Sequence, residues 1–346
     1  MSGDRSLLQN HFKVLPVERR PELTDFTQPQ DIPSPEHSGA TKSVAGTVLG
    51  YAIVGALALL CGWYVKSHWS DFAFLADVSR GEVVIAALLI LASYVLNVVQ
   101  MHCFLSKLGL RLGYMELTGI TNGMMLANLI IPMRGGTGGF AVYLKKAHGL
   151  DFGGFAVMYA GTALIVALIN TGLSLVALVL LAAMYGRVYP VLGLGVSALF
   201  ACCLYLCVFP PPAEWGRGGL TGVALKPAHS WHLLTRDRRL LAWVSGLLLL
   251  ISLCLTASFY FIYRSIGAPL SPCAVMITSS LGSIANLVPL TPGSLGIFDA
   301  VTIQIPQIFG LDPARAIAAT LVFRVLTFVW ACVLGVPGMI YILARR

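Results

Sequence analysis

Long hydrophobic runs separated by short polar stretches make up most of the chain after its first 43 residues. A transmembrane helix needs about 20 apolar residues to cross about 30 Å of hydrocarbon. Runs of this length predict full spans at about 44–65, 83–105, 155–184, 189–209, 240–264 and 314–343. The pattern therefore predicts an all-α polytopic membrane protein with about six full spans.

Two further apolar stretches, about 114–147 and 271–308, are interrupted by glycine and proline. The first contains IPMRGGTGG (Ile131–Gly139), and the second contains LTPGSLG (Leu290–Gly296). Proline interrupts the helical hydrogen bonds, and glycine lets the chain turn. Non-helical backbone at membrane depth survives only where protein buries it or where it lines a watery cavity. We expect two re-entrant helical hairpins; the alternative is that the glycines only let helices approach closely.

Short identities indicate that the two broken stretches are copies. The tripeptide ANL at Ala127–Leu129 recurs at Ala285–Leu287, a shift of 158, and GLD at Gly149–Asp151 recurs at Gly310–Asp312, a shift of 161. Three full spans separate each element from its copy, so the copies face opposite ways. We expect an inverted-topology repeat, with a tail at 1–43, repeat 1 at 44–185 and repeat 2 at 186–346. Transporters often place substrate sites at the midplane between such halves, although a duplication alone does not establish transport.

The positions of lysine and arginine predict the orientation. If the polar, proline-rich tail is cytosolic, sixteen of the 23 lysines and arginines lie on the cytosolic side and five on the other. The positive-inside rule then places both termini in the cytosol, in the cytoplasmic (inner) membrane. It also accounts for the net charge of +8, so no nucleic-acid partner is expected. The composition of the tail predicts disorder.

The other two cations, Arg134 and Arg324, lie inside membrane segments. Arg324 is ten residues into the last predicted span, and an arginine at a helix centre costs about 2.5–3.5 kcal/mol on insertion scales. It therefore needs a partner, for which Asp299 is the nearest carboxylate; such a pair could also be purely structural. Arg134 has no carboxylate beside it in the first break and is expected to bind an anionic head group. A helix that starts just after each break would present N–H groups suited to phosphate.

The sequence gives little support for metal binding, catalysis or a cofactor. The eight cysteines all lie in hydrophobic segments without the spacing of a zinc site, so no metal is expected. No nucleophile lies near a base in a defensible arrangement, which favours a function other than catalysis. No cofactor motif is present either.

The sequences ANLVPLTPGSLGIFDA and AATLVFRVLTFVWACVLG resemble the lysylphosphatidylglycerol synthase transmembrane-region family. That family often has Pro-Gly-Gly-Leu-Gly-x-x-Glu-Ala followed by an arginine in the final helix. The matching positions here are Pro292, Gly293, Leu295, Gly296, Asp299, Ala300 and Arg324, with Ser294 in place of a glycine. The first half is similar through Asn128, Leu129, Pro132, Arg134 and Gly136. Thr137 and Phe140 stand where many relatives have Glu and Arg.

The resemblance implies either lipid translocation or a membrane partner for an enzyme that acts on lipid head groups. In aminoacylating members a separate soluble domain transfers the amino acid. This chain ends at Arg346, directly after the last predicted span. Aminoacyl transfer by this polypeptide alone is therefore not expected.

The sequence predicts a flippase-like translocator of a lipid or lipid-linked glycan that binds an anionic head group in a midplane cavity. The lipid is a phospholipid or a polyprenyl-linked species. The alternative is a non-transporting partner that presents lipid to a glycosyltransferase or an aminoacyltransferase; a membrane-embedded enzyme acting on lipid phosphates ranks last. The predicted binding residues are Arg134, Asn128, Gly135, Gly136, Asn286, Pro292, Gly293, Gly296, Asp299 and Arg324.

Overall fold

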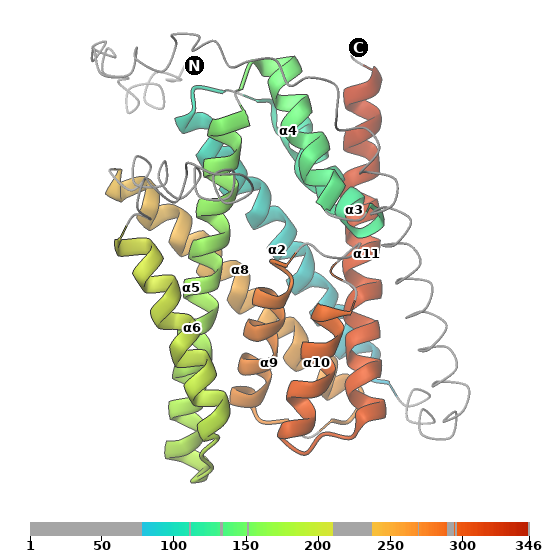
Figure 1. Ribbon diagram of the computed structural model, residues 1–346. Helices are drawn as coiled ribbons and strands as arrows, with labels where there is room; N and C mark the ends of the chain where they lie inside the picture. Colours follow the sequence, from blue (N-terminus) through green and yellow to red (C-terminus); the bar gives the residue numbers. More distant parts are fainter. Residues whose placement is uncertain are drawn as a thin grey trace, which may run out of the picture. The chain divides into compact units, whose positions relative to one another are not determined.

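Five of the described helices are long and apolar enough to cross a membrane. They are α2 (Arg80–Lys107), α5 (Phe152–Tyr185), α6 (Pro190–Val208), α8 (Arg238–Ser265) and α11 (Pro313–Ala344) (Figure 1). Each coincides with a predicted span to within a few residues. The computed structural model describes residues 78–110, 112–131, 134–150, 152–209, 237–268, 270–288, 294 and 296–344. The predicted tail and the predicted first span at 44–65 lie outside them.

Each broken stretch forms two short helices. The first gives α3 (Tyr114–Ile130) and α4 (Gly135–His148), and the second gives α9 (Pro272–Ala285) and α10 (Ile297–Ile308). All four are shorter than the 18 residues of a candidate span. Figure 1 shows α3 and α4 near the C-terminal half of α11, and α9 and α10 near its N-terminal half. The two pairs therefore occupy opposite ends of the bundle.

Helices on the two sides of α6 are related by their spacing along the chain. Helices α2 and α8 both have 28 residues. A shift of 158 relates the starts of α2 and α8 and the starts of α3 and α9, whereas a shift of 161 relates the starts of α5 and α11. Left-handed glycines follow the matched helices at the same shifts. Gly109 (φ 81°) corresponds to Gly267 (φ 65°), and Gly149 (φ 72°) corresponds to Gly310 (φ 87°).

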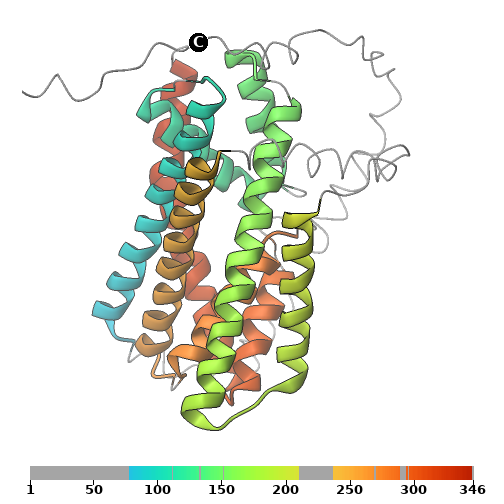
Figure 2. The same cartoon turned by 90° about the vertical axis from the view of Figure 1, so that its left-hand side faces the viewer.

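Helices α2 and α8 run in opposite directions. At one end of the α2–α8 pair, Lys107 Nζ lies 2.5 Å from Asp237 Oδ2, which joins the end of α2 to the start of α8. At the other end, Arg264 Nε lies 3.0 Å from Glu82 Oε1. Figures 1 and 2 show that α5 and α11 also run in opposite directions.

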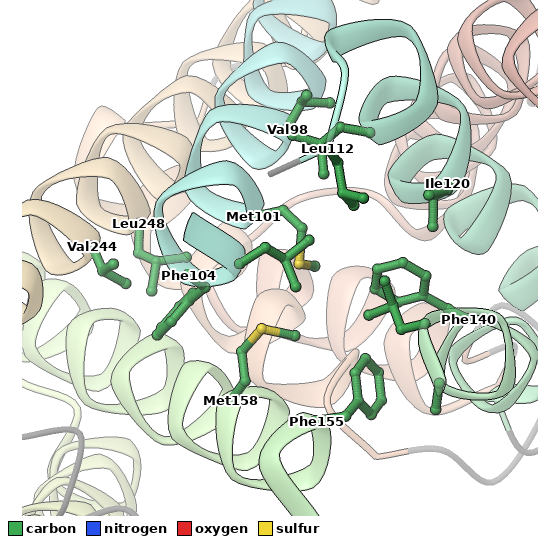
Figure 3. Packing of buried hydrophobic residues seen from close by; sticks show 14 of the residues in the cluster. Val98, Met101, Phe104, Leu112, Ile120, Phe140, Phe155, Met158, Val244 and Leu248 are labelled. Carbon is green, nitrogen blue, oxygen red and sulfur yellow. The ribbon is translucent and has the colours of Figure 1, made fainter. Parts of the chain in front are cut away.

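Apolar packing and a few polar contacts hold the bundle together. Figure 3 shows one buried cluster in which side chains of α2, α4, α5 and α8 converge, including Met101, Phe140 and Met158. Hydrogen bonds also cross between helices. Asn170 Nδ2 donates to Ser252 Oγ at 3.2 Å, and Thr256 Oγ1 donates to Ser279 Oγ at 3.2 Å. In lipid, bonds of this kind typically contribute about 0.6–2 kcal/mol.

Glycines bring α3 and α11 into close contact. A Cβ atom at Gly338 would lie 2.0 Å from the Cα of Gly119, and a Cβ at Gly335 would lie 3.0 Å from the carbonyl of Asn122. Small residues at such positions let two backbones approach and gain dispersion contacts. This crossing ties the first short helix pair to the last long helix.

We predict that Gly338→Ala lowers the free energy of unfolding by about 1–3 kcal/mol, because the new methyl group forces the two backbones apart. Unfolding in detergent, followed by circular dichroism, measures the effect. Gly246→Ala on α8 is the control, because nothing lies within 4 Å of its added Cβ. Equal stability of both variants would contradict the close crossing.

Asp237 caps α8 and contributes a pH-dependent stability. Its side chain accepts hydrogen bonds from Lys107 and from the Leu240 N–H at 3.0 Å, and these bonds hold the pKa of the Asp237 carboxyl below its ordinary value. Because the folded pKa is lowered, the contribution is present above pH of about 4 and is lost as the pH falls through the lowered value. Asp237→Asn should therefore melt below wild type at pH 7, and the gap should close towards pH 3. A gap that does not change with pH would contradict this.

Candidate functional site

Two non-glycine residues with left-handed backbone mark the two helix breaks. Arg134, which directly precedes α4, and Ser294, which precedes α10, both have φ of 53°. In the described ranges they are the non-glycine residues with positive φ. This conformation costs an L-residue roughly 1–2 kcal/mol. Surrounding contacts must therefore hold both residues in place.

The two breaks meet at the backbone carbonyl of Asn286. The Arg134 guanidinium donates one hydrogen bond to this carbonyl and another to the phenol oxygen of Tyr159 on α5. The Ser294 hydroxyl donates to the same carbonyl at 3.2 Å. The guanidinium carbon also lies 5.6 Å from the centre of the Tyr159 ring. One arginine from the first break thus touches both α5 and the second break.

The hydrogen-bond partners of Arg134 are neutral. Within the ranges that the structure covers, they are a phenol and a peptide carbonyl. Neither compensates a full positive charge, as a carboxylate would. A half-buried cation with neutral partners favours an anion at the same place.

Asn128 and Gly136 fix the start of α4 against the end of α3. The Asn128 side chain donates to Thr137 Oγ1 and accepts from the Thr137 N–H, both at 3.0 Å. A Cβ atom at Gly136 would lie 2.4 Å from the carbonyl oxygen of Met124. Close packing therefore accounts for Gly136, and in the same way for Gly135, where a Cβ would lie 2.3 Å from the Ile131 side chain. Contact of these residues with substrate stays a prediction.

The predicted Asp299–Arg324 pair is present. Arg324 Nε on α11 lies 2.5 Å from Asp299 Oδ1, and the side chains are 19% and 23% exposed, respectively. The other carboxylate oxygen accepts the Gly296 N–H at 3.0 Å, which caps the start of α10. The Arg324 guanidinium carbon lies 5.1 Å from the centre of the Phe298 ring. Asp299 thus neutralises the charge of Arg324 and also complements the positive end of α10.

The starts of α4 and α10 differ in charge. Asp299 lies in the first turn of α10, whereas the first turn of α4 has no acidic residue. Both the helix dipole and Arg134 therefore leave positive charge at the start of α4. Of the two breaks, the first therefore has the less balanced positive charge.

The predicted residues form two groups. Arg134 meets the Asn286 carbonyl, while Gly296, Asp299 and Arg324 form the second group. Among the residues with described positions, no hydrogen bond or ion pair joins Arg134 to Asp299, the acceptor of the second group. A phosphate shared by Arg134 and Arg324 stays a prediction. Pro292 and Gly293 lie outside the described residues.

Two contributors were not predicted from the sequence. Tyr159 lies inside an apolar run, and a single phenol there resembles an ordinary core residue. Ser294 lies 160 residues after Arg134, a shift between the observed shifts of 158 and 161. It is therefore the counterpart of Arg134 in the predicted repeat. The repeat spacing could have identified Ser294, whereas nothing in the sequence singles out Tyr159.

We predict that Asp299 and Arg324 are energetically coupled. In a double-mutant cycle with Asp299→Asn, which keeps an acceptor for the Gly296 N–H, and Arg324→Met, the interaction energy should be about 1–3 kcal/mol. Thermal unfolding in detergent measures each corner of the cycle. Additive effects of the two substitutions would contradict a stabilising pair.

Known membrane proteins resemble this chain. A family model described as the lysylphosphatidylglycerol synthase TM region matches residues 47–335, which includes every helix described above except the end of α11. A protein described as a UPF0104 membrane protein, from Methanothermobacter thermautotrophicus, is 25% identical over 109 residues. The matched segment covers 32% of this chain and 32% of that protein, so it spans about a third of the relative's length.

Proposed function

We propose a function for this chain, which belongs to the lysylphosphatidylglycerol synthase TM region family. The chain is an integral membrane protein, and its family is associated with membrane lipid metabolism. We propose that it translocates a phospholipid or a polyprenyl-linked lipid across the cytoplasmic membrane. In this proposal the anionic head group binds between two helix breaks near the midplane.

The first part of the proposal is an inverted-topology repeat. Its support is the pattern of the helices: α2 and α8 have equal lengths, their starts are related by the shift of 158, and they run antiparallel. The paired left-handed glycines at the helix ends support the same relation. The repeats would be 44–185 and 186–346, with α6 as the counterpart of the predicted span at 44–65.

The second part is that α3–α4 and α9–α10 are re-entrant hairpins that enter from opposite sides. Their lengths support this, because 17 residues at 1.5 Å each reach about 26 Å and the other three helices are shorter. The meeting of both breaks at one carbonyl supports it as well. Irregular backbone at such depth is the usual construction of a transporter site.

The observation that carries the proposal is the environment of Arg134. Its charge faces a phenol and a carbonyl, beside a helix start that has no acidic residue. A phosphate oxygen would replace a neutral acceptor by a charged one, so a negative charge would face the guanidinium, with which phosphate often forms paired hydrogen bonds. Asp299 neutralises the charge of Arg324, so Arg324 would contribute to binding chiefly by holding α10 in position.

The charge distribution supports the orientation within the proposal. More lysines and arginines lie on the side that holds the Lys107 end of α2 than on the side that holds Arg264. We therefore place both termini in the cytosol.

A second candidate is a partner that presents lipid to a separate glycosyltransferase or aminoacyltransferase without moving it. The description of the family supports this candidate, because it names the membrane region of a synthase. Both candidates use the same head-group site. They differ in whether the purified chain alone moves lipid between leaflets.

Transfer in proteoliposomes tests the proposal. Wild-type protein should move fluorescent phosphatidylglycerol or polyprenyl phosphate between leaflets, as measured by chemical quenching of the outer leaflet. Arg134→Gln should slow transfer at least about tenfold, because a charge-assisted bond is lost. Arg187→Gln, in the exposed link between α5 and α6, is the matched control and should behave as wild type.

Two outcomes decide between the candidates. Wild-type transfer that Arg134→Gln leaves intact would refute the role of Arg134. Absence of transfer of either lipid by wild type, with retained binding, would favour the presenting partner.

A further inference from the structure

We infer that Tyr159 is a second ligand of the head-group anion and forms a two-donor clamp with Arg134. This inference rests on the proposed function and names a binding residue that neither the family's motif nor the sequence pattern indicates. The clamp joins the first helix break to α5, because Tyr159 lies on α5 and Arg134 lies directly before α4.

The hydrogen bond between the two side chains leaves the phenol proton available. The Tyr159 oxygen accepts from the Arg134 guanidinium, and a phenol can donate and accept at the same time. Within the part of the chain that has described positions, no protein group accepts the Tyr159 proton. The Arg134 guanidinium carries further N–H groups near the Tyr159 oxygen. An anionic oxygen at this place would thus receive donors from both residues.

Aromatic packing holds the phenol in place. The Tyr159 ring lies under the Arg134 guanidinium, 5.6 Å from ring centre to guanidinium carbon. It also stacks on Phe155, one helical turn earlier, with centroids 6.1 Å apart and planes at 20°. Phe155 in turn meets the edge of Phe140 on α4 at 5.5 Å. A donor fixed in this way loses little entropy on binding, and so it contributes more to affinity.

The clamp also specifies which contact the ligand replaces. The two hydrogen bonds of Arg134 lead to different parts of the molecule, Tyr159 on α5 and the Asn286 carbonyl in the second break. Tyr159 can both hold Arg134 and donate to the ligand, whereas a carbonyl can only accept. An entering phosphate oxygen therefore displaces the Asn286 carbonyl and keeps Tyr159.

Binding of short-chain lipids to the full-length protein in detergent tests the clamp. The probes are dihexanoylphosphatidylglycerol, uncharged dihexanoylglycerol and inorganic phosphate, titrated by calorimetry. Tyr159→Phe keeps the ring under Arg134 but removes the hydroxyl. Tyr143→Phe is the matched control. The Tyr143 hydroxyl donates to Glu116 Oε1 at 2.6 Å, near the far end of α4.

The clamp predicts that Tyr159→Phe weakens the phospholipid about tenfold or more, with the uncharged lipid and the melting temperature unchanged. Tyr143→Phe should bind as wild type. Equal weakening of charged and uncharged lipids by Tyr159→Phe would show a packing role and overturn the clamp. Inorganic phosphate that binds wild type as tightly as the phospholipid does would identify a free anion as the ligand and overturn the assignment to a lipid head group.

Arg134→Gln separates this inference from the proposed function. Loss of phospholipid binding in Arg134→Gln together with wild-type binding in Tyr159→Phe would refute the clamp and leave the proposed function standing. Wild-type binding in both variants would refute the head-group site itself, and the clamp with it.

Discussion

Backbone hydrogen bonding is the constraint on which the structure of this membrane domain depends. A helix satisfies its own N–H and C=O groups in hydrocarbon, but each break leaves some of them open. The chain supplies partners from side chains beside the breaks. Asn128 serves the start of α4, Asp299 serves the start of α10, and Arg134 serves the carbonyl of Asn286. The residues that repair the backbone are therefore the same residues that create a polar site.

The side chains that bond the open backbone groups differ in charge between the first and the second half of the chain. In the second half, Asp299 caps α10 and neutralises Arg324, so the local charge is balanced. In the first half, a neutral asparagine and threonine join α3 to α4, and the cation of Arg134 crosses to the other half. Ser294, at the matching left-handed position, is neutral. In the proposed function, the first half therefore holds the head group while the second half provides the opposing wall.

Much of the fold could be predicted from the sequence, because bilayer thickness and hydrophobic length are directly related. The five described long helices and both broken stretches follow from hydropathy. The Asp299–Arg324 pair could also be anticipated, since a cation inside a span needs a partner. The acceptor for Arg134 could not, because it is a backbone carbonyl 152 residues away and any residue carries one. The packing roles of Gly135 and Gly136 likewise depend on how closely α4 returns to α3.

In the proposed function, Arg134 holds the phosphate of a membrane lipid. The most direct test is the distance between the guanidinium carbon and lipid phosphorus, measured by ¹³C–³¹P rotational-echo NMR on arginine-labelled protein in a bilayer. A bidentate or single charge-assisted bond places these atoms about 4 Å apart. Wild-type protein should show a contact at this distance, and the contact should disappear in Arg134→Gln. The same signal in both proteins would contradict it, because the contact would then come from arginines elsewhere in the chain.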